Sequence, residues 1–301
     1  MQRFLPLIFA FMWISSYGQD DLLNELEQKQ PEQTDYTIQT FKGTRVINGR
    51  SVETKPAGSL EFIISHRFGY INSGSYNLWG LDESTIRLGL EYGISDRWGV
   101  GVGRSSWDKS FDFFTEYKLL RQATGQHSFP FTMTLLASAA YLDLKDPALE
   151  GYTSSDRMSY AFQALIARKF SSAFTFQVAP IFVHKNRVDD ATGQAITAND
   201  IFALGLATRV KITRSLGLDV EYYPRFNEID ESPFTDSFGI AIEIETGGHV
   251  FQLVFTNSNG MMERRYVTET FGDFWDGDIR FGFNITRTFQ LSKKSRDSKN
   301  W

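Results

Sequence analysis

The chain has 301 residues, no cysteine and a formal net charge of −5. The absence of cysteine excludes disulfides, thiolate metal sites and a lipid anchor on an N-terminal cysteine. The mild negative charge argues against nucleic acid as a partner, because proteins that bind nucleic acid present a clustered basic face.

Residues 1–19, MQRFLPLIFAFMWISSYGQ, have the pattern of a secretory signal peptide. One arginine precedes an apolar run from Phe4 to Ile14, and small and polar residues follow it. The run is shorter than the roughly 20 apolar residues of a membrane-spanning helix. We therefore expect export of the chain. The next segment, residues 20–36, is acidic and rich in glutamine, which predicts a solvated periplasmic tether.

Residues 37–58 alternate only weakly between apolar and polar side chains. Counting them with the strands that follow would give thirteen strands, an odd number that does not suit a membrane barrel. We predict instead that the segment is a plug or a periplasmic cap, paired with acidic residues of a barrel wall. The candidate plug residues are Lys42, Arg45, Asn48 and Arg50.

From residue 59 onward, apolar and polar residues alternate in twelve segments. In STIRLGLEYG, residues 84–93, every second residue is apolar, which is the period of a strand. Many of the segments hold about 10 alternating residues, enough to cross a bilayer as a tilted strand. The predicted strands are 59–71, 84–95, 97–106, 110–122, 129–142, 156–170, 173–187, 200–213, 216–226, 236–246, 249–258 and 278–290.

The connections between these strands alternate between short turns and long loops. Short turns at one end, long loops at the other and an even strand number are typical of an outer-membrane barrel. We predict an all-β, up-and-down antiparallel barrel of about 12 strands over residues 59–291, closed by pairing of the first and last strands. Residues 292–301 are expected to be a polar periplasmic tail. The apolar face should meet membrane lipid; in the alternative, a soluble sandwich, it would point inward.

Five blocks of the sequence resemble a known family. They are FKGTRVINGRSVE (41–53), LEFIISHRFG (60–69), STIRLGLEYGISDR (84–97), ETGGHVFQLVFTNSNGMME (245–263) and GDIRFGFNITRTF (277–289). Together they resemble the barrel family called domain of unknown function 5777. The resemblance implies a barrel in the outer membrane of a Gram-negative bacterium, which barrel-assembly machinery would insert. It implies no activity.

Ionised residues recur on the strand face opposite the apolar one. Burying them costs free energy unless they form ion pairs or are hydrated by a channel. Separate acidic and basic walls would set a field across a pore and steer small polar solutes. Mutual pairing would instead form a rigid network. The predicted lumen residues are Glu61, Arg67, Arg87, Glu91, Arg209, Asp219, Glu221, Arg225, Glu243, Glu245 and Arg280.

Two further features bear on binding. The long loop 259–277 is rich in aromatic residues, so it is expected to bind a surface partner or ligand, or to fold over the barrel mouth. Gly99, Gly101 and Gly103 alternate within a strand, so they are expected to make room in the lumen rather than to cradle a phosphate. The candidates for surface-loop binding are Trp79, Arg264, Arg265, Phe274 and Trp275.

Ser65 and His66 raise the alternative of an outer-membrane hydrolase. As neighbours in a strand they point to opposite faces, so His66 would need a serine and an orienting group from elsewhere. Four scattered histidines make no metal site, and we predict no cofactor and no catalytic residue. We expect a non-enzymatic barrel, with a narrow or gated lumen for small polar or charged solutes. The alternatives are a non-conducting scaffold that binds a periplasmic or surface partner protein through its loops, and a hydrolase.

Overall fold

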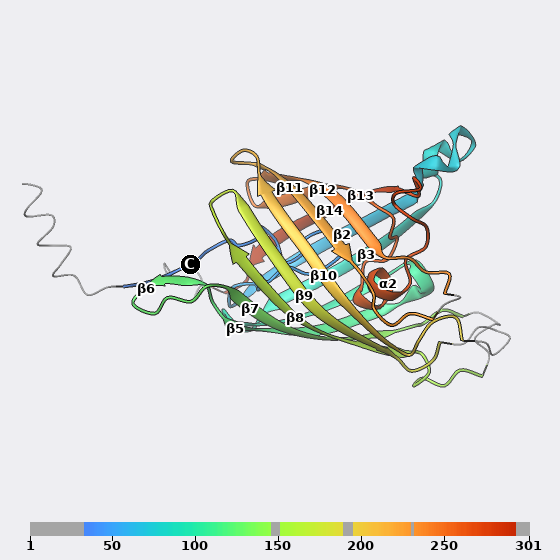
Figure 1. Cartoon of the computed structure of the whole chain (residues 1–301), viewed down its shortest axis with the longest axis horizontal. Coiled ribbons are helices and arrows are strands. Elements are labelled where there is room, and N and C mark those ends of the chain that lie inside the picture. The colour runs from blue at the N-terminus through green and yellow to red at the C-terminus, as the bar shows by residue number, and fades with distance from the viewer. Residues whose placement is uncertain (1–32, 146–150, 189–194, 230–231, 293–301) are drawn as a thin grey trace, which may run out of the picture.

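Twelve antiparallel strands close into a barrel in the computed structural model, which describes residues 33–145, 151–188, 195–229 and 232–292. Figure 1 shows the strands tilted around a single lumen. The barrel strands in this described part are β2 (Ser59–Tyr70), β3 (Ser84–Gly93), β4 (Trp98–Ser105), β5 (Phe111–Leu120), β7 (Thr132–Tyr141), β8 (Met158–Lys169), β9 (Phe174–Lys185), β10 (Asp200–Lys211), β11 (Leu216–Tyr223), β12 (Ser237–Thr246), β13 (His249–Thr256) and β14 (Arg280–Gln290).

Each barrel strand pairs with the barrel strands before and after it in the sequence, and β14 pairs with β2 to close the sheet. At this seam, Phe283 lies opposite His66. Closure gives the backbone groups of both end strands a partner, which a sheet in lipid requires. All twelve predicted strands are confirmed, with ends that differ by at most three residues.

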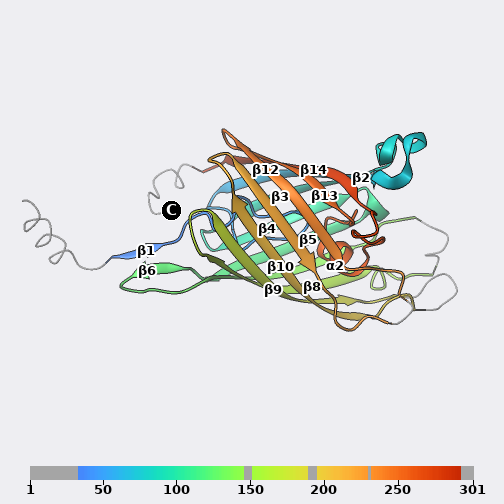
Figure 2. The ribbon, with the colours of Figure 1, turned by 45° about the horizontal axis from the view of Figure 1, so that its top comes forward.

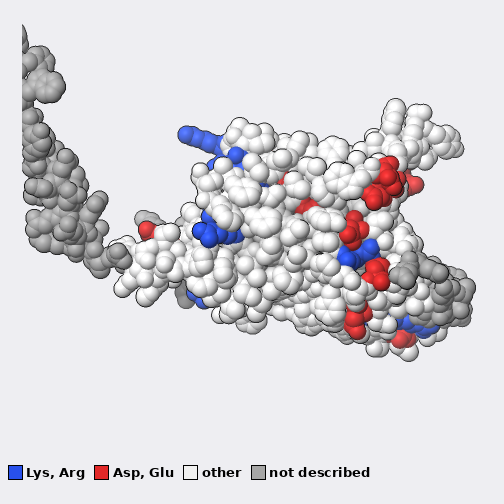
Figure 3. Space-filling model, viewed as in Figure 1, with Lys and Arg blue, Asp and Glu red and all other residues white. Residues whose placement is uncertain are grey.

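Apolar side chains point outward and ionised ones point inward. On β5, Phe113 and Tyr117 are 52% and 46% exposed, whereas Asp112 and Glu116 are each 2% exposed. Figure 3 shows the middle of one outer face almost bare of charged side chains, which gather toward the two ends. The sandwich alternative is therefore wrong, because it would bury the apolar face.

The two ends of the barrel differ. A two-stranded ribbon of β1 (Thr34–Tyr36) and β6 (Ala123–Gly125) lies at the end with the short turns. The end with the long loops carries η1 (Ile71–Ser73), η2 (Ser75–Gly80), η3 (Trp107–Lys109) and α2 (Glu263–Thr268), and we call it the outer mouth. The ribbon and these helices were not predicted.

Within the described residues, no helix is both long and apolar enough to span a bilayer. The predicted signal peptide (1–19) lies outside the described residues. So do most of the predicted tether (20–36) and all but the first residue of the predicted tail (292–301).

The glycines of β4 make room for side chains of the neighbouring strands. A Cβ atom on Gly101 would lie 2.1 Å from the Phe114 ring, and one on Gly103 would lie 2.2 Å from the guanidinium of Arg87. These side chains can therefore lie across β4 inside the lumen. The expectation that the glycines create space is confirmed, and the phosphate-loop reading is wrong because the glycines lie within β4 and only the three-residue 3-10 turn η3 follows it.

Candidate functional site

A hairpin of the N-terminal segment lies inside the barrel. Val46 N–H donates to the carbonyl of Gly49 and Ser51 N–H donates to the carbonyl of Thr44, both at 2.9 Å. Side chains at the tip of this hairpin are completely buried. It enters from the end with the short turns, as the blue trace within the strands shows in Figure 2. We call residues 44–51 the plug hairpin.

The tip of the plug hairpin is seated on a buried carboxylate. The backbone N–H groups of residues 47, 48 and 49 donate to the Glu221 carboxylate at 3.2, 2.8 and 3.1 Å. Successive N–H groups that converge on one anion form a backbone nest. Gln252 and Asn284 donate to the carbonyls of residues 46 and 47 at 2.6 and 2.9 Å. Polar contacts therefore fix the tip from several strands.

Arg50 connects the plug hairpin to the wall and to an outer loop. Its guanidinium lies 2.9 Å from Glu91, 3.8 Å from Glu116 and 3.6 Å from Glu263. The same group stacks over the Phe114 ring, 3.3 Å from its centroid. Burial alone would lower the pKa of Arg50, but the three carboxylates outweigh burial and raise it. Arg50 is thus a fixed cation at the centre of the lumen.

The other predicted plug residues also contact the lumen. Arg45 donates to the carbonyls of Asn48 and Met261 at 2.7 and 3.3 Å. Burial and the nearby arginines lower the pKa of Arg45 to about 10. Lys42 lies nearer the end with the short turns and pairs with Glu245 at 2.6 Å.

An outer loop closes the lumen from the opposite end. Met261, Met262, Tyr266 and Val267 are all buried, because α2 and the residues before it fold into the barrel. The apolar residues of this loop were not recognised in the sequence as a buried face. The plug hairpin and the α2 loop together fill the middle of the barrel.

The surface-loop prediction is wrong for Arg265, whereas Arg264 is half-buried. Arg265 is buried and pairs with Asp108 and Glu269, and Arg264 lies 3.0 Å from Glu269. Arg265 holds the loop to η3 through Asp108, whereas the pair of Arg264 with Glu269 lies within the loop. The aromatic candidates lie elsewhere: Trp79 and Trp275 are exposed, and Phe274 packs against Phe238 with the ring centroids 4.7 Å apart.

Charges on the barrel wall are paired across one intervening strand. Arg87 of β3 lies 2.5 Å from Asp112 of β5, and Arg209 of β10 lies 2.5 Å from Glu243 of β12. No acidic wall faces a basic wall in the described part of the barrel. Of the remaining predicted residues, Glu61 pairs with Lys55, Asp219 accepts from Gln252, and Arg225 lies past the end of β11 beside Asp236 and Glu228. Arg67 and Arg280 lie near the outer mouth.

The lumen side of β8, β9 and β10 carries an apolar area built largely from small residues. It faces the apolar side chains of the plug segment, including Phe41 and Ile47. The wall residues of this cluster are Ala161, Leu165, Ala167, Ala179, Ile181, Val183, Ile201, Ala203 and Ala207. The alternation FKGTRVINGRSV (41–52) is the sequence signal that could have predicted this contact.

The described residues leave a cavity at each mouth. The cavity at the outer mouth has a volume of about 320 Å³, and we call it the outer-mouth cavity. A second cavity of about 290 Å³ lies between residues 37–43 and the wall at the opposite end. The lining of the outer-mouth cavity includes Arg67, Thr85, Ser106, Trp107, Asn259 and Arg280.

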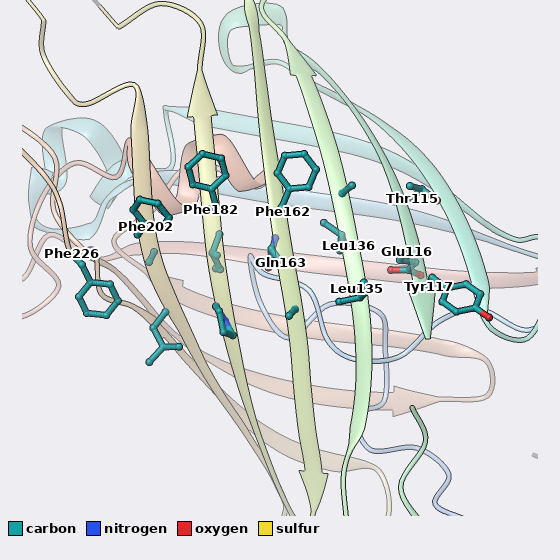
Figure 4. Close-up of a pocket in the computed structure, with 16 residues that line it drawn as sticks. Thr115, Glu116, Tyr117, Leu135, Leu136, Phe162, Gln163, Phe182, Phe202 and Phe226 are labelled. Atoms are coloured by element: carbon teal, nitrogen blue, oxygen red, sulfur yellow. The ribbon is translucent and has the colours of Figure 1, made fainter. Parts of the chain in front are cut away.

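A larger hollow of about 780 Å³ lies on the outer face of the barrel. Figure 4 shows Phe162, Phe182 and Phe202 projecting side by side from β8, β9 and β10. Pro180 lies on β9 within this hollow and has no N–H to donate to the sheet. Because this face is apolar and points away from the lumen, lipid chains suit it better than a polar solute does.

The structure brings together no hydrolytic dyad at Ser65 and His66. Ser65 faces the lumen, and His66 stacks on Phe283 with the ring centroids 5.0 Å apart. Within the described residues, no group of three or more acidic or histidine side chains could hold a metal ion.

Glu269 should make retention of the α2 loop dependent on pH. Burial raises its pKa, but Arg264, Arg265 and Lys185 outweigh burial and lower it to about 2. The contribution of ionised Glu269 to the free energy of unfolding should be complete above about pH 4.5. It should decline as the pH falls toward about 2, by up to about 3 kcal/mol. Melting of the detergent-solubilised protein at pH 6 and pH 3 tests this. The loss of stability should be smaller in Glu269→Gln, and an equal loss in both proteins would contradict the assignment.

Comparison with known families gives one match. The family model for a membrane bound beta barrel domain, domain of unknown function 5777, matches residues 41–289. No curated protein matches the chain.

Several solved barrel structures are similar to the chain at low sequence identity. The NanC porin is 9% identical, with a TM-score of 0.48, and the match covers 77% of this chain and 100% of the porin. An outer membrane channel from Pseudomonas putida F1 is 11% identical, with a TM-score of 0.48 and coverages of 79% and 98%. Omp33 of Acinetobacter baumannii is 9% identical, with a TM-score of 0.41 and coverages of 77% and 98%. At such identities and scores, these structures do not indicate a solute.

Proposed function

Because the chain belongs to the family of membrane bound beta barrel domains, we propose that it is a non-enzymatic outer-membrane channel for small polar or charged solutes, closed by its plug hairpin. The plug hairpin and the α2 loop occupy the lumen in this closed state. The solute path opens when the plug hairpin leaves its seat, because its departure removes Arg50 from Glu263 and so also frees the α2 loop, and water replaces both.

The observation that supports this proposal best is the polar seat of the plug hairpin. Its tip is bound by the Glu221 carboxylate and by amide side chains, and its base by the carboxylates around Arg50. Water can satisfy each of these groups after release, so the polar contacts do not make release prohibitive. A seat made only of apolar contacts would resist hydration far more strongly.

Conductance of the mature chain, residues 20–301, in planar bilayers tests the proposal. The full chain should show little current, and a variant lacking residues 37–53 should show a steady current at least about tenfold larger. Glu221→Gln provides a milder variant, because charge-assisted hydrogen bonds contribute about 1.5–3 kcal/mol each. Asp82→Asn, which removes an exposed carboxylate just after η2, is the control and should change the current little. Absence of any rise in both the deletion and the Glu221 variant would rule out a plug.

A second candidate function is a scaffold for a surface partner protein. It is favoured by η2, where Tyr76 is 95% exposed and Leu78, Trp79 and Leu81 are also exposed. Exposed apolar clusters of this kind mark interaction sites. The two candidates differ in one measurement: a pure scaffold should stay non-conducting after removal of residues 37–53.

A further inference from the structure

Two buried arginines of the lumen lack the carboxylate partner that the others have. Arg87, Arg209 and Arg50 are all paired with acidic residues. Arg67 and Arg280 are 0% and 8% exposed, yet in the described part of the chain neither makes an ion pair with a carboxylate. A buried charge is costly without a counter-charge. The pair therefore places two positive charges without a directly paired carboxylate beside the outer-mouth cavity.

The local backbone places both arginines at this cavity. They lie on β2 and β14, the two strands of the closing seam. The register of the seam shifts between Arg280 and Gly282, and such bulges redirect side chains near binding sites. A Cβ atom on Gly282 would lie 2.7 Å from Cδ of Arg67, so the glycine lets Arg67 lie across β14.

The guanidinium of Arg280 has N–H groups that do not donate to the described protein. Its Nη1 donates to the carbonyl of Phe68 at 3.3 Å, and its guanidinium lies 3.6 Å above the centroid of the Tyr70 ring. Its Nε is buried and has no partner among the described residues. A ligand in the cavity could accept hydrogen bonds from these remaining N–H groups.

Arg67 holds the plug hairpin through a neutral group. Its Nε and Nη2 both donate to the side-chain oxygen of Asn48, at 3.2 and 2.8 Å. A carboxylate can instead accept one hydrogen bond from each of these two groups, on its two oxygens, and its charge strengthens both bonds. A ligand carboxylate would therefore compete with Asn48 for the same donors.

We propose that the outer-mouth cavity binds the carboxylate of a small hydroxylated acid between Arg67 and Arg280, and that binding draws Arg67 away from Asn48 and releases the plug hairpin. The release of the plug hairpin rests on the proposed channel function, whereas the binding of the acid does not. Thr85, Ser106 and Asn259 line the cavity with groups that can bind hydroxyls. The volume of about 320 Å³ lies at the lower end for ligand pockets and so suits a small molecule.

One acidic residue, Glu83, also lines this cavity. It is exposed at the rim, where water screens its charge. It therefore opposes an anion less than the two buried arginines attract one.

Calorimetric titration of the detergent-solubilised mature chain with gluconate tests the site. Gluconate should bind, and glucose, its neutral counterpart, should not. Arg280→Gln should weaken binding at least about tenfold. Arg104→Gln is the control. It removes a charge from β4 at the same end of the barrel, where Arg104 stacks on Phe111, and it should leave binding unchanged. No binding by the wild-type chain, or equal binding by Arg280→Gln, would overturn the site, and inorganic phosphate binding as tightly as gluconate would overturn its assignment to carboxylates.

Bilayer current tests the coupling to the plug hairpin. Gluconate at the outer mouth should raise the current of the wild-type chain but not that of Asn48→Asp, because the introduced carboxylate would hold Arg67 itself. Binding without a rise in current, in a protein that conducts after removal of residues 37–53, would overturn the competition alone. If that deletion does not conduct, the channel function fails, while the titration still decides whether the acid site exists.

Discussion

Replacing Gly49 by alanine should open the channel, whereas the same change at Gly43 should not. A Cβ atom on Gly49 would lie 1.6 Å from the hydroxyl oxygen of Tyr223 and 2.7 Å from Cζ of its ring. Tyr223 is itself buried and cannot move aside freely. At Gly43 the nearest atom to such a Cβ is 3.7 Å away, an ordinary contact. Neither glycine has a positive φ, so backbone strain does not distinguish them.

The clash at Gly49 should weaken seating of the plug hairpin by about 1–3 kcal/mol, as overpacking does in cores. This corresponds to a ratio of open to closed channels that is roughly fivefold to 150-fold higher. Single-channel recording gives that ratio directly as the open probability. Equal open probabilities for Gly49→Ala and Gly43→Ala would show that the tip is not seated against Tyr223 as described.

Arg50→Met should have a still larger effect, because it leaves three carboxylates around an empty position. Removing one partner of a buried ion pair destabilises a protein by about 3–5 kcal/mol. Glu91 and Glu116 of the wall and Glu263 of the α2 loop would then repel one another. The plug hairpin and the α2 loop should therefore both bind the barrel less tightly. The carboxylates that become exposed should favour passage of cations.

The reversal potential in a potassium chloride gradient measures this selectivity, together with the open probability. Arg50→Lys should be intermediate, since it keeps the charge but loses the planar guanidinium. Arg104→Met, which removes an arginine that stacks on Phe111 of the neighbouring strand, is the control and should behave as the wild type does. A closed Arg50→Met channel with an unchanged melting temperature would contradict the central role of this cation.

The barrel could be predicted because its signals are local. A side-chain period of two and the lengths of connections are properties of short stretches, so strand positions and faces follow directly from them. The seam between β2 and β14 follows from the need to close a sheet in lipid. These inferences do not depend on knowing which residues meet across the lumen.

The interior could not be predicted to the same extent. Pairing of Arg50 with Glu263 depends on how deeply two separate segments enter the barrel, and alternation within strands carries no information about that depth. Arg265 was misplaced on the surface because α2 has only six residues, too few for a clear helical period. The β1–β6 ribbon was missed because each of its strands is only three residues long.

This ribbon has a consequence for how quickly the channel can shut. The ribbon fixes the chain at Tyr36, and β2 fixes it again at Ser59. A displaced plug hairpin therefore remains anchored to the barrel at both of its ends. Residues 37–43, fully extended, reach no more than about 25 Å. The released segment therefore stays beside its vacated seat at a local concentration in the millimolar range, whatever the protein content of the membrane. Reclosure is then a first-order step, and open intervals should be brief and independent of channel density.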